Sequence, residues 1–394
     1  MRLRLLGSIA ASAALLFGQA VIAVVPVSAS SPLTITADMP AAIPVGHNWT
    51  FNDFFPRSVR VPTGSTIQFL VEGFHTATLL PAGMSATQDT KLNGVAKVDE
   101  DPGKKPNGTT HTQLNLPGLS PTSFTCGTPA LPCGFDGTSV VSSGASFGPP
   151  SGPFAVHITA APGTYAFLCR VHPGMSGHIT VLAQNAQGTT PAQLAKAVHD
   201  QVKADVKAGF AAEEKVEHSS HVANGDGTTS WYMTAGTGSP DGHVAVNEFL
   251  PLVLGIHPGD KVFWRPQSVN EIHTVTFPGE LNTDLLPMCE GATGDTLAIP
   301  KELPPNGPFD FRCGTQPFPD EVEIGGGNGV RNITAPGQIS DSGVFGTRAM
   351  RASLNLPQGS IFSRWSVSFT GAAKGSYTYI CQIHAGMEAT ITVH

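Results

Sequence analysis

The sequence predicts an all-β protein built from two tandem β-sandwiches that are joined by a helical linker. Three observations support this prediction. The chain has 44 glycines and 33 prolines among its 394 residues, a composition that favours many short strands separated by turns. Its length exceeds what one hydrophobic core usually supports. Its two halves also carry the same motifs in the same order, which indicates an internal duplication.

The duplication is visible in two alignments without gaps. Residues 52–69 (NDFFPRSVRVPTGSTIQF) align with residues 247–264 (NEFLPLVLGIHPGDKVFW), and residues 163–181 align with residues 375–393. In all four segments apolar and polar residues alternate, as in strands with one buried face. The predicted division of the chain is a signal peptide at 1–29, a first domain at 32–183, a linker at 184–227 and a second domain at 228–394.

The linker contains a predicted helix at about 190–217. Thr190 is a good N-cap, and Pro191 suits the first helical position. One apolar stripe follows with a spacing of four residues: Leu194, Val198, Val202, Val206 and Phe210. Because a solvated linker needs no such stripe, we expect the helix to dock on one or both domains. Gly209 is expected to end or bend it.

The first 29 residues have two arginines, a long apolar run and small residues at Val27-Ser28-Ala29. This pattern is typical of a signal peptide cleaved after Ala29, and an uncleaved membrane anchor is the alternative. We therefore expect an extracytoplasmic protein, secreted, periplasmic or on the cell surface, with no membrane span after cleavage. The formal net charge of −7 and the lack of a basic patch argue against a nucleic-acid partner.

The same motif, Cys-x-x-His-x-x-Met, occurs once in each repeat between two strand patterns. Its members are Cys169, His172 and Met175 in the first repeat and Cys381, His384 and Met387 in the second. A thiolate, an imidazole and a thioether form a ligand set that suits copper. Zinc is the alternative metal, but structural zinc sites rarely use methionine. Core packing of the three side chains would explain one such motif more readily than two.

A trigonal copper site needs a second imidazole from another strand. Each repeat offers one after its Pro-x-Gly strand, His75 in EGFHTATLLP and His273 in NEIHTVTFPG. With these histidines the pattern resembles the blue-copper proteins, or cupredoxins, of the plastocyanin, azurin and amicyanin type. The resemblance implies Greek-key sandwiches with two type 1 copper ions. It also implies the metal ligands His75, Cys169, His172 and Met175, and His273, Cys381, His384 and Met387.

The same resemblance assigns further roles. Thr76 and Thr274 stand where family members carry a residue that ties the two ligand loops together. The histidine of the Cys-x-x-His loop is exposed in the family and serves as the electron port. We therefore expect one-electron transfer with redox protein partners that dock near His172 and His384.

Four cysteines remain outside the motifs, and in an exported chain an even number implies disulfides. Three pairings are possible. We favour the two within the domains, Cys126–Cys133 and Cys289–Cys313. Each would close the long insert between the upstream histidine and the ligand cysteine.

Two other functions would use parts of the same pattern. Storage, delivery or resistance would use the same copper ligands, and the sequence does not separate it from a carrier. The resemblance of this chain to copper oxidases and nitrite reductases is weaker, because those enzymes have a histidine directly before the ligand cysteine. Here Leu168 and Ile380 hold that place, and the chain has no His-x-His pair. We therefore expect no enzyme. The repeated His47 and His243 are candidates for a structural role or a secondary metal site.

Overall fold

The computed structural model describes residues 32–98, 112–145, 152–216, 219–279, 329–358, 361 and 363–394, and four short strands between 288 and 324. The predicted signal peptide lies outside this part. Leu33–His394 forms one compact unit. Among the described residues no helix is long and apolar enough to cross a membrane.

Two five-stranded sheets form the first repeat. One has the order β3-β1-β5-β11-β9 and the other β10-β6-β12-β13-β4. Strand β1 runs parallel to β5, and β4 runs parallel to β13. The bounds are β1 (Leu33–Ala37), β3 (Phe54–Phe55), β4 (Ser58–Pro62), β5 (Thr66–Val71), β6 (Thr78–Leu79), β9 (Cys133–Phe135), β10 (Val141–Ser142), β11 (Phe154–Ile158), β12 (Gly163–Leu168) and β13 (Ser176–Leu182).

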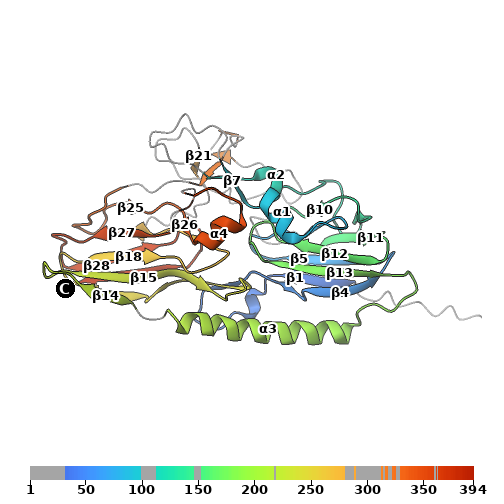
Figure 1. Ribbon diagram of the computed structural model, residues 1–394, viewed down its shortest axis with the longest axis horizontal. Helices are drawn as coiled ribbons and strands as arrows, with labels where there is room; N and C mark the ends of the chain where they lie inside the picture. Colours follow the sequence, from blue (N-terminus) through green and yellow to red (C-terminus); the bar gives the residue numbers. More distant parts are fainter. Residues whose placement is uncertain are drawn as a thin grey trace, which may run out of the picture. The chain divides into compact units, whose positions relative to one another are not determined.

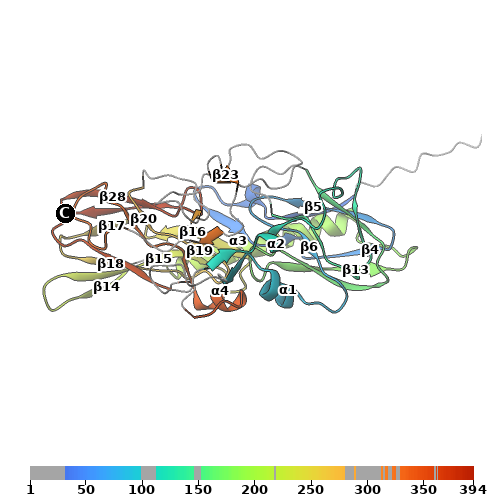
Figure 2. The same ribbon diagram turned by 90° about the horizontal axis from the view of Figure 1, so that it is seen from above.

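The strands of the second repeat pair in the same way. Strand β15 runs parallel to β18, and β17 runs parallel to β29. One sheet has the order β2-β16-β15-β18-β27, with β14 paired to β15, and the other has the order β17-β29-β28-β20-β25. In both Figure 1 and Figure 2, strands β15, β18 and β28 lie in the same part of the molecule. The bounds are β2 (Trp49–Phe51), β14 (Ser220–Ala223), β15 (Thr229–Gly238), β16 (Val244–Leu250), β17 (Val253–Ile256), β18 (Lys261–Arg265), β20 (Thr276–Phe277), β25 (Ser340–Asp341), β27 (Trp365–Ser368), β28 (Gly375–Ile380) and β29 (Glu388–Val393).

Each pair of sheets encloses its own apolar core, as alternating strands with one buried face must. In the first repeat Phe69 of β5 and Phe167 of β12 meet edge to face with ring centroids 5.4 Å apart. In the second, Trp264 of β18 and Tyr379 of β28 meet in the same manner at 5.4 Å. The expected all-β architecture, two tandem β-sandwiches joined by a helix, is confirmed.

A third apolar cluster joins the repeats. Strand β2 comes from the first repeat but pairs with β16 of the second, with Thr50 opposite Ala245. If the alignment of 52–69 with 247–264 is extended back by three residues, β2 corresponds to residues 244–246 of β16, so the two paired segments are equivalent in the repeats. The buried side chains of the cluster are Trp49, Phe51, Phe55, Val216, Val244, Val246 and Leu250.

Helix α3 (Pro191–Glu214) covers this third cluster (Figure 1). Thr190 caps its N-terminus, where its side chain accepts a hydrogen bond from the backbone N–H of Gln193. Val198, Val202 and Val206 pack on the cluster, and Leu194 packs on the core of the first repeat. The helix therefore docks, as expected from its apolar stripe.

Gly209 does not end the helix, which continues to Glu214. A Cβ atom at this position would lie 2.5 Å from the ring of Trp49. Because Gly209 has no side chain, the helix can approach the indole ring of Trp49 closely.

Candidate metal centres

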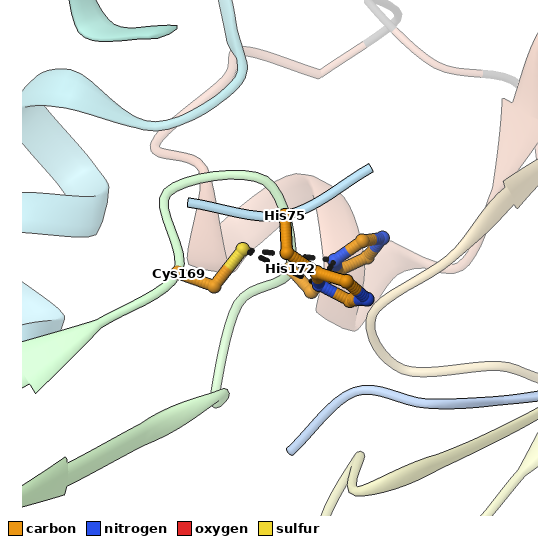
Figure 3. A group of neighbouring side chains, drawn as sticks. All are labelled: His75, Cys169 and His172. Carbon is orange, nitrogen blue, oxygen red and sulfur yellow. Dashed lines mark hydrogen bonds between the residues drawn. The ribbon is translucent and has the colours of Figure 1, made fainter. Parts of the chain in front are cut away.

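Three predicted ligands of the first repeat lie together (Figure 3). The Sγ atom of Cys169 lies 3.6 Å from Nδ1 of His75 and 3.8 Å from Nδ1 of His172, and the two Nδ1 atoms are 3.0 Å apart. Cys169 follows β12, whereas His75 lies in the loop before β6. Two segments far apart in the sequence thus turn one sulfur and two nitrogen atoms toward a common point.

The second repeat brings together the corresponding set, His273, Cys381 and His384. The Sγ atom of Cys381 lies 3.6 Å from Nδ1 of His384. His273 is fully buried, and within the described part of the chain neither of its ring nitrogens has a hydrogen-bond partner. A buried polar atom without a partner is costly, so this imidazole suits a site at which a metal would accept its lone pair.

The two methionines close the ligand loops. In the first loop the backbone N–H of Cys169 donates to the carbonyl of Met175 at 2.9 Å, and that of Met175 donates to the carbonyl of His172 at 3.2 Å. The second loop has the same pair of bonds between its equivalent residues. Both thioether side chains are buried at 1 % exposure. The Cys-x-x-His-x-x-Met spacing is thus the spacing of a tight turn between adjacent strands.

The threonines beside the upstream histidines do tie the loops together. The backbone N–H of Thr76 donates to Sγ of Cys169 at 3.3 Å, and its hydroxyl accepts from the N–H of Arg170 at 2.9 Å. Thr274 does the same for Cys381 and Gln382, at 3.3 Å and 2.8 Å. An N–H group aimed at sulfur stabilises a thiolate.

Buried charges lower the thiol pKa values. Burial alone would raise the pKa of both cysteines, but the hydrogen bonds and positive charges of the imidazoles outweigh it. The pKa of Cys169 and that of Cys381 fall well below the ordinary value. Each site therefore favours the thiolate, which is the form that binds metal.

The expected exposure of the loop histidines is wrong for His172, which is only 7 % exposed. Its Nε2 atom lies 3.0 Å from Oε1 of Glu271 in the second repeat. Nε2 of His384 lies 3.4 Å from Oε2 of the same carboxylate. The sequence does not single out Glu271, which aligns with Gly73 of the first repeat.

A cavity of about 470 Å³ adjoins both loop histidines. Its wall includes His172, Glu271 and His384 together with apolar side chains such as Ile272 and Met350. A pocket of this size holds a small molecule.

Cys126 and Cys133 form a disulfide with an S–S distance of 2.04 Å, the pairing favoured above. The side chains of Cys289 and Cys313 lie outside the described part of the chain, and their pairing stays a prediction.

The two other repeated histidines lie in acidic clusters. His47 lies 2.9 Å from Glu213 and 3.7 Å from Glu248. His243 lies in a group with Asp53 and Asp205, and there Arg57 supplies the neutralising cation. We draw no metal site from either cluster.

A scan against models of known protein families found no match, and neither did a search of curated proteins. Among solved structures, auracyanin from Roseiflexus castenholzii is 16 % identical over 37 % of this chain and 87 % of its own, with a TM-score of 0.18. The Cu-containing nitrite reductase of Thermus scotoductus is 13 % identical over 85 % of this chain and 59 % of its own, with a TM-score of 0.18. A blue copper oxidase from Nitrosomonas europaea is 12 % identical over 92 % and 85 %, with a TM-score of 0.17. At such low scores these likenesses carry no argument for this chain.

Proposed function

We propose that this chain is an exported copper protein that holds one type 1 copper ion in each repeat and transfers single electrons. The observation that carries the proposal is the pair of buried Cys–His–His sets, each with a thiol of lowered pKa and a backbone N–H aimed at its sulfur. The ligands are His75, Cys169, His172 and Met175, and His273, Cys381, His384 and Met387.

The residues around each site suit one-electron chemistry. Copper, when bound, supplies a centre that changes its oxidation state by one electron. The threonine bonds and the tight methionine turn hold the two ligand loops in place. A rigid ligand set keeps nearly one geometry in both oxidation states, which keeps the reorganisation energy low. His384 is the more accessible loop histidine, with its side chain 15 % exposed, so we place the docking of redox partners at its loop.

The decisive experiment is a titration of the purified protein with Cu(II), followed by metal analysis and visible spectroscopy. We expect two copper ions per chain and an intense blue thiolate absorption. Cys169→Ala and Cys381→Ala should each remove one copper and the absorption of that site. A colourless protein, or one that retains zinc in preference to copper, would refute the proposal.

Two alternatives have their own outcomes. If the chain binds copper tightly but the copper cannot be reversibly reduced and reoxidised, a storage or delivery function is favoured. The cavity that adjoins His172 and His384 favours an oxidase or reductase acting on a small molecule. Turnover of a small substrate by the copper-loaded chain, lost in both cysteine variants, would establish that second function.

A further inference from the structure

One carboxylate serves both candidate centres. Oε1 of Glu271 lies 3.0 Å from Nε2 of His172, and Oε2 lies 3.4 Å from Nε2 of His384. Nδ1 of each of these imidazoles faces the ligand cysteine of its own site. The connection from Cys169 to Cys381 therefore consists of two imidazole rings and one carboxylate, with hydrogen bonds between them.

Glu271 is fixed in this place. It is only 5 % exposed, and Asn52 of the first repeat also donates a hydrogen bond to Oε1 at 2.7 Å. A carboxylate is costly to bury unless donors surround it, and here three donors from both repeats do so. Burial by itself would raise the pKa of Glu271, but the facing histidines hold it well below the usual range.

The internal duplication does not account for this carboxylate. The sequence aligned with Asn270-Glu271-Ile272-His273 is Glu72-Gly73-Phe74-His75, so Gly73 stands opposite Glu271. The first repeat therefore has no counterpart in this position. Glu271 therefore contacts the loop histidines of both sites from a position at which the first repeat has no acid.

We propose that Glu271 couples the two metal centres into one internal electron-transfer pair. The inference rests on the proposed copper function. With copper bound in both sites, one electron would pass between the centre at Cys169 and the centre at Cys381, in either direction, with no bond broken and no net proton transferred. Hydrogen bonds between a ligand imidazole and a carboxylate tune the metal, so one acid shared by two imidazoles makes each centre respond to the state of the other.

The test is one-electron reduction of the fully copper-loaded chain by pulse radiolysis. The spectra of Cys169→Ala and Cys381→Ala identify each site. We expect a re-equilibration phase whose rate is independent of protein concentration. In Glu271→Gln this phase should slow by about tenfold or more, because the amide NH2 replaces one carboxylate oxygen and so places a donor opposite the N–H group of one of the two imidazoles. Asp341→Asn is the matched control, since this partly buried carboxylate lines the same cavity but accepts its hydrogen bonds from Thr276 and from the backbone of Gly343.

A second measurement needs no metal. In the metal-free chain labelled with ¹⁵N-histidine, Glu271→Gln should shift the Nε2 resonances of both His172 and His384, whereas Asp341→Asn should leave them in place. If Glu271→Gln does not fold or loses copper, Asn52→Leu removes one donor to Oε1 and should slow the same phase.

The outcomes separate the two proposals. Two bound coppers with an unchanged internal rate in Glu271→Gln, or in Asn52→Leu when it replaces that variant, would overturn the coupling and leave the copper function standing. Absence of blue copper in the wild-type chain would instead overturn the copper function.

Discussion

At the scale of single residues, the two candidate centres have side chains of the same types but differ in the residue that packs on the upstream histidine. The strand registers place Asp38 and Gly236 at equivalent positions, and both have left-handed backbone conformations, with φ of 64° and 69°. The carboxylate of Asp38 lies 4.0 Å from Nε2 of His75. At Gly236 a Cβ atom would lie 1.9 Å from Nε2 of His273. The second centre thus has the closer backbone, and it has an uncharged glycine at the position of Asp38.

Gly236→Ala should therefore empty the second centre alone. The new methyl group must displace the ring of His273, and the positive φ adds about 1 kcal/mol of strain. We expect bound copper to fall from two ions per chain to one, with the absorption of the Cys169 site retained. Gly227→Ala is the control, because its φ is 84° and a Cβ there would meet nothing within 4 Å. Two coppers retained in Gly236→Ala would contradict this account.

At the scale of elements, helix α3 is held to the first repeat by a charged cluster as well as by its apolar stripe. Asp205 of the helix lies 3.0 Å from Nη2 of Arg57, which also pairs with Asp53. Burial, followed by the neighbouring Asp53, raises the pKa of Asp205 to about 8. One guanidinium thus faces two buried carboxylates, and the second carboxylate prefers to stay protonated.

This pKa shift sets a pH dependence of stability. Between the ordinary pKa of an aspartate and pH 8, Asp205 holds its proton in the folded chain and loses it in the unfolded chain. The folded state binds more protons, so the free energy of unfolding falls as the pH rises through this range. Asp205→Asn should abolish that fall, which at about 1.4 kcal/mol per pH unit amounts to a few kcal/mol between pH 5 and pH 8. Denaturant unfolding of both proteins at pH 5 and pH 8 measures it; equal slopes against pH would exclude the shift.

The elements that the sequence predicts are those with local signals. Capping residues and an apolar residue at every fourth position specify α3. Alternating apolar and polar residues, together with Pro-x-Gly turns, specify the strands around the ligand loops. The Cys-x-x-His spacing and the upstream histidines predict the Cys–His–His set that lies together in each repeat, whereas the methionine ligands stay a prediction. The occurrence of the motif in both repeats supports a metal site, because core packing alone would explain one such motif more readily than two.

What the sequence does not predict depends on contacts between the repeats. Nothing near Glu271 indicates that it faces His172, because 99 residues of chain separate them and only the pairing of sheets brings them together. The same holds for β2, whose pattern suits the first repeat equally well but which pairs with β16 of the second. Burial of His172 follows from these contacts, and so the family expectation of an exposed histidine fails.

At the scale of the whole molecule, the third apolar cluster ties the two repeats to one another. Trp49 from β2 is 2 % exposed, its indole N–H donates to Glu213 of α3 at 2.5 Å, and its ring meets Phe210 edge to face with centroids 5.0 Å apart. A chain of this length divided into two independent domains would unfold in two steps. Here neither repeat keeps all of its sheet partners and its apolar contacts without the other.

We therefore expect the metal-free chain to unfold in one transition, with tryptophan fluorescence and far-UV circular dichroism giving the same midpoint. Copper bound to the Cys169 site alone, in Cys381→Ala, should raise that single midpoint, because a ligand stabilises the whole cooperative unit that binds it.

Trp49→Ala should lower the free energy of unfolding by about 3–5 kcal/mol through the cavity it leaves. It should also separate the transition into two, because it removes the centre of the shared cluster. Two transitions in the wild-type chain, or copper at one site that stabilises only half of the signal, would show that the repeats fold independently and that the cluster between them adds little to stability.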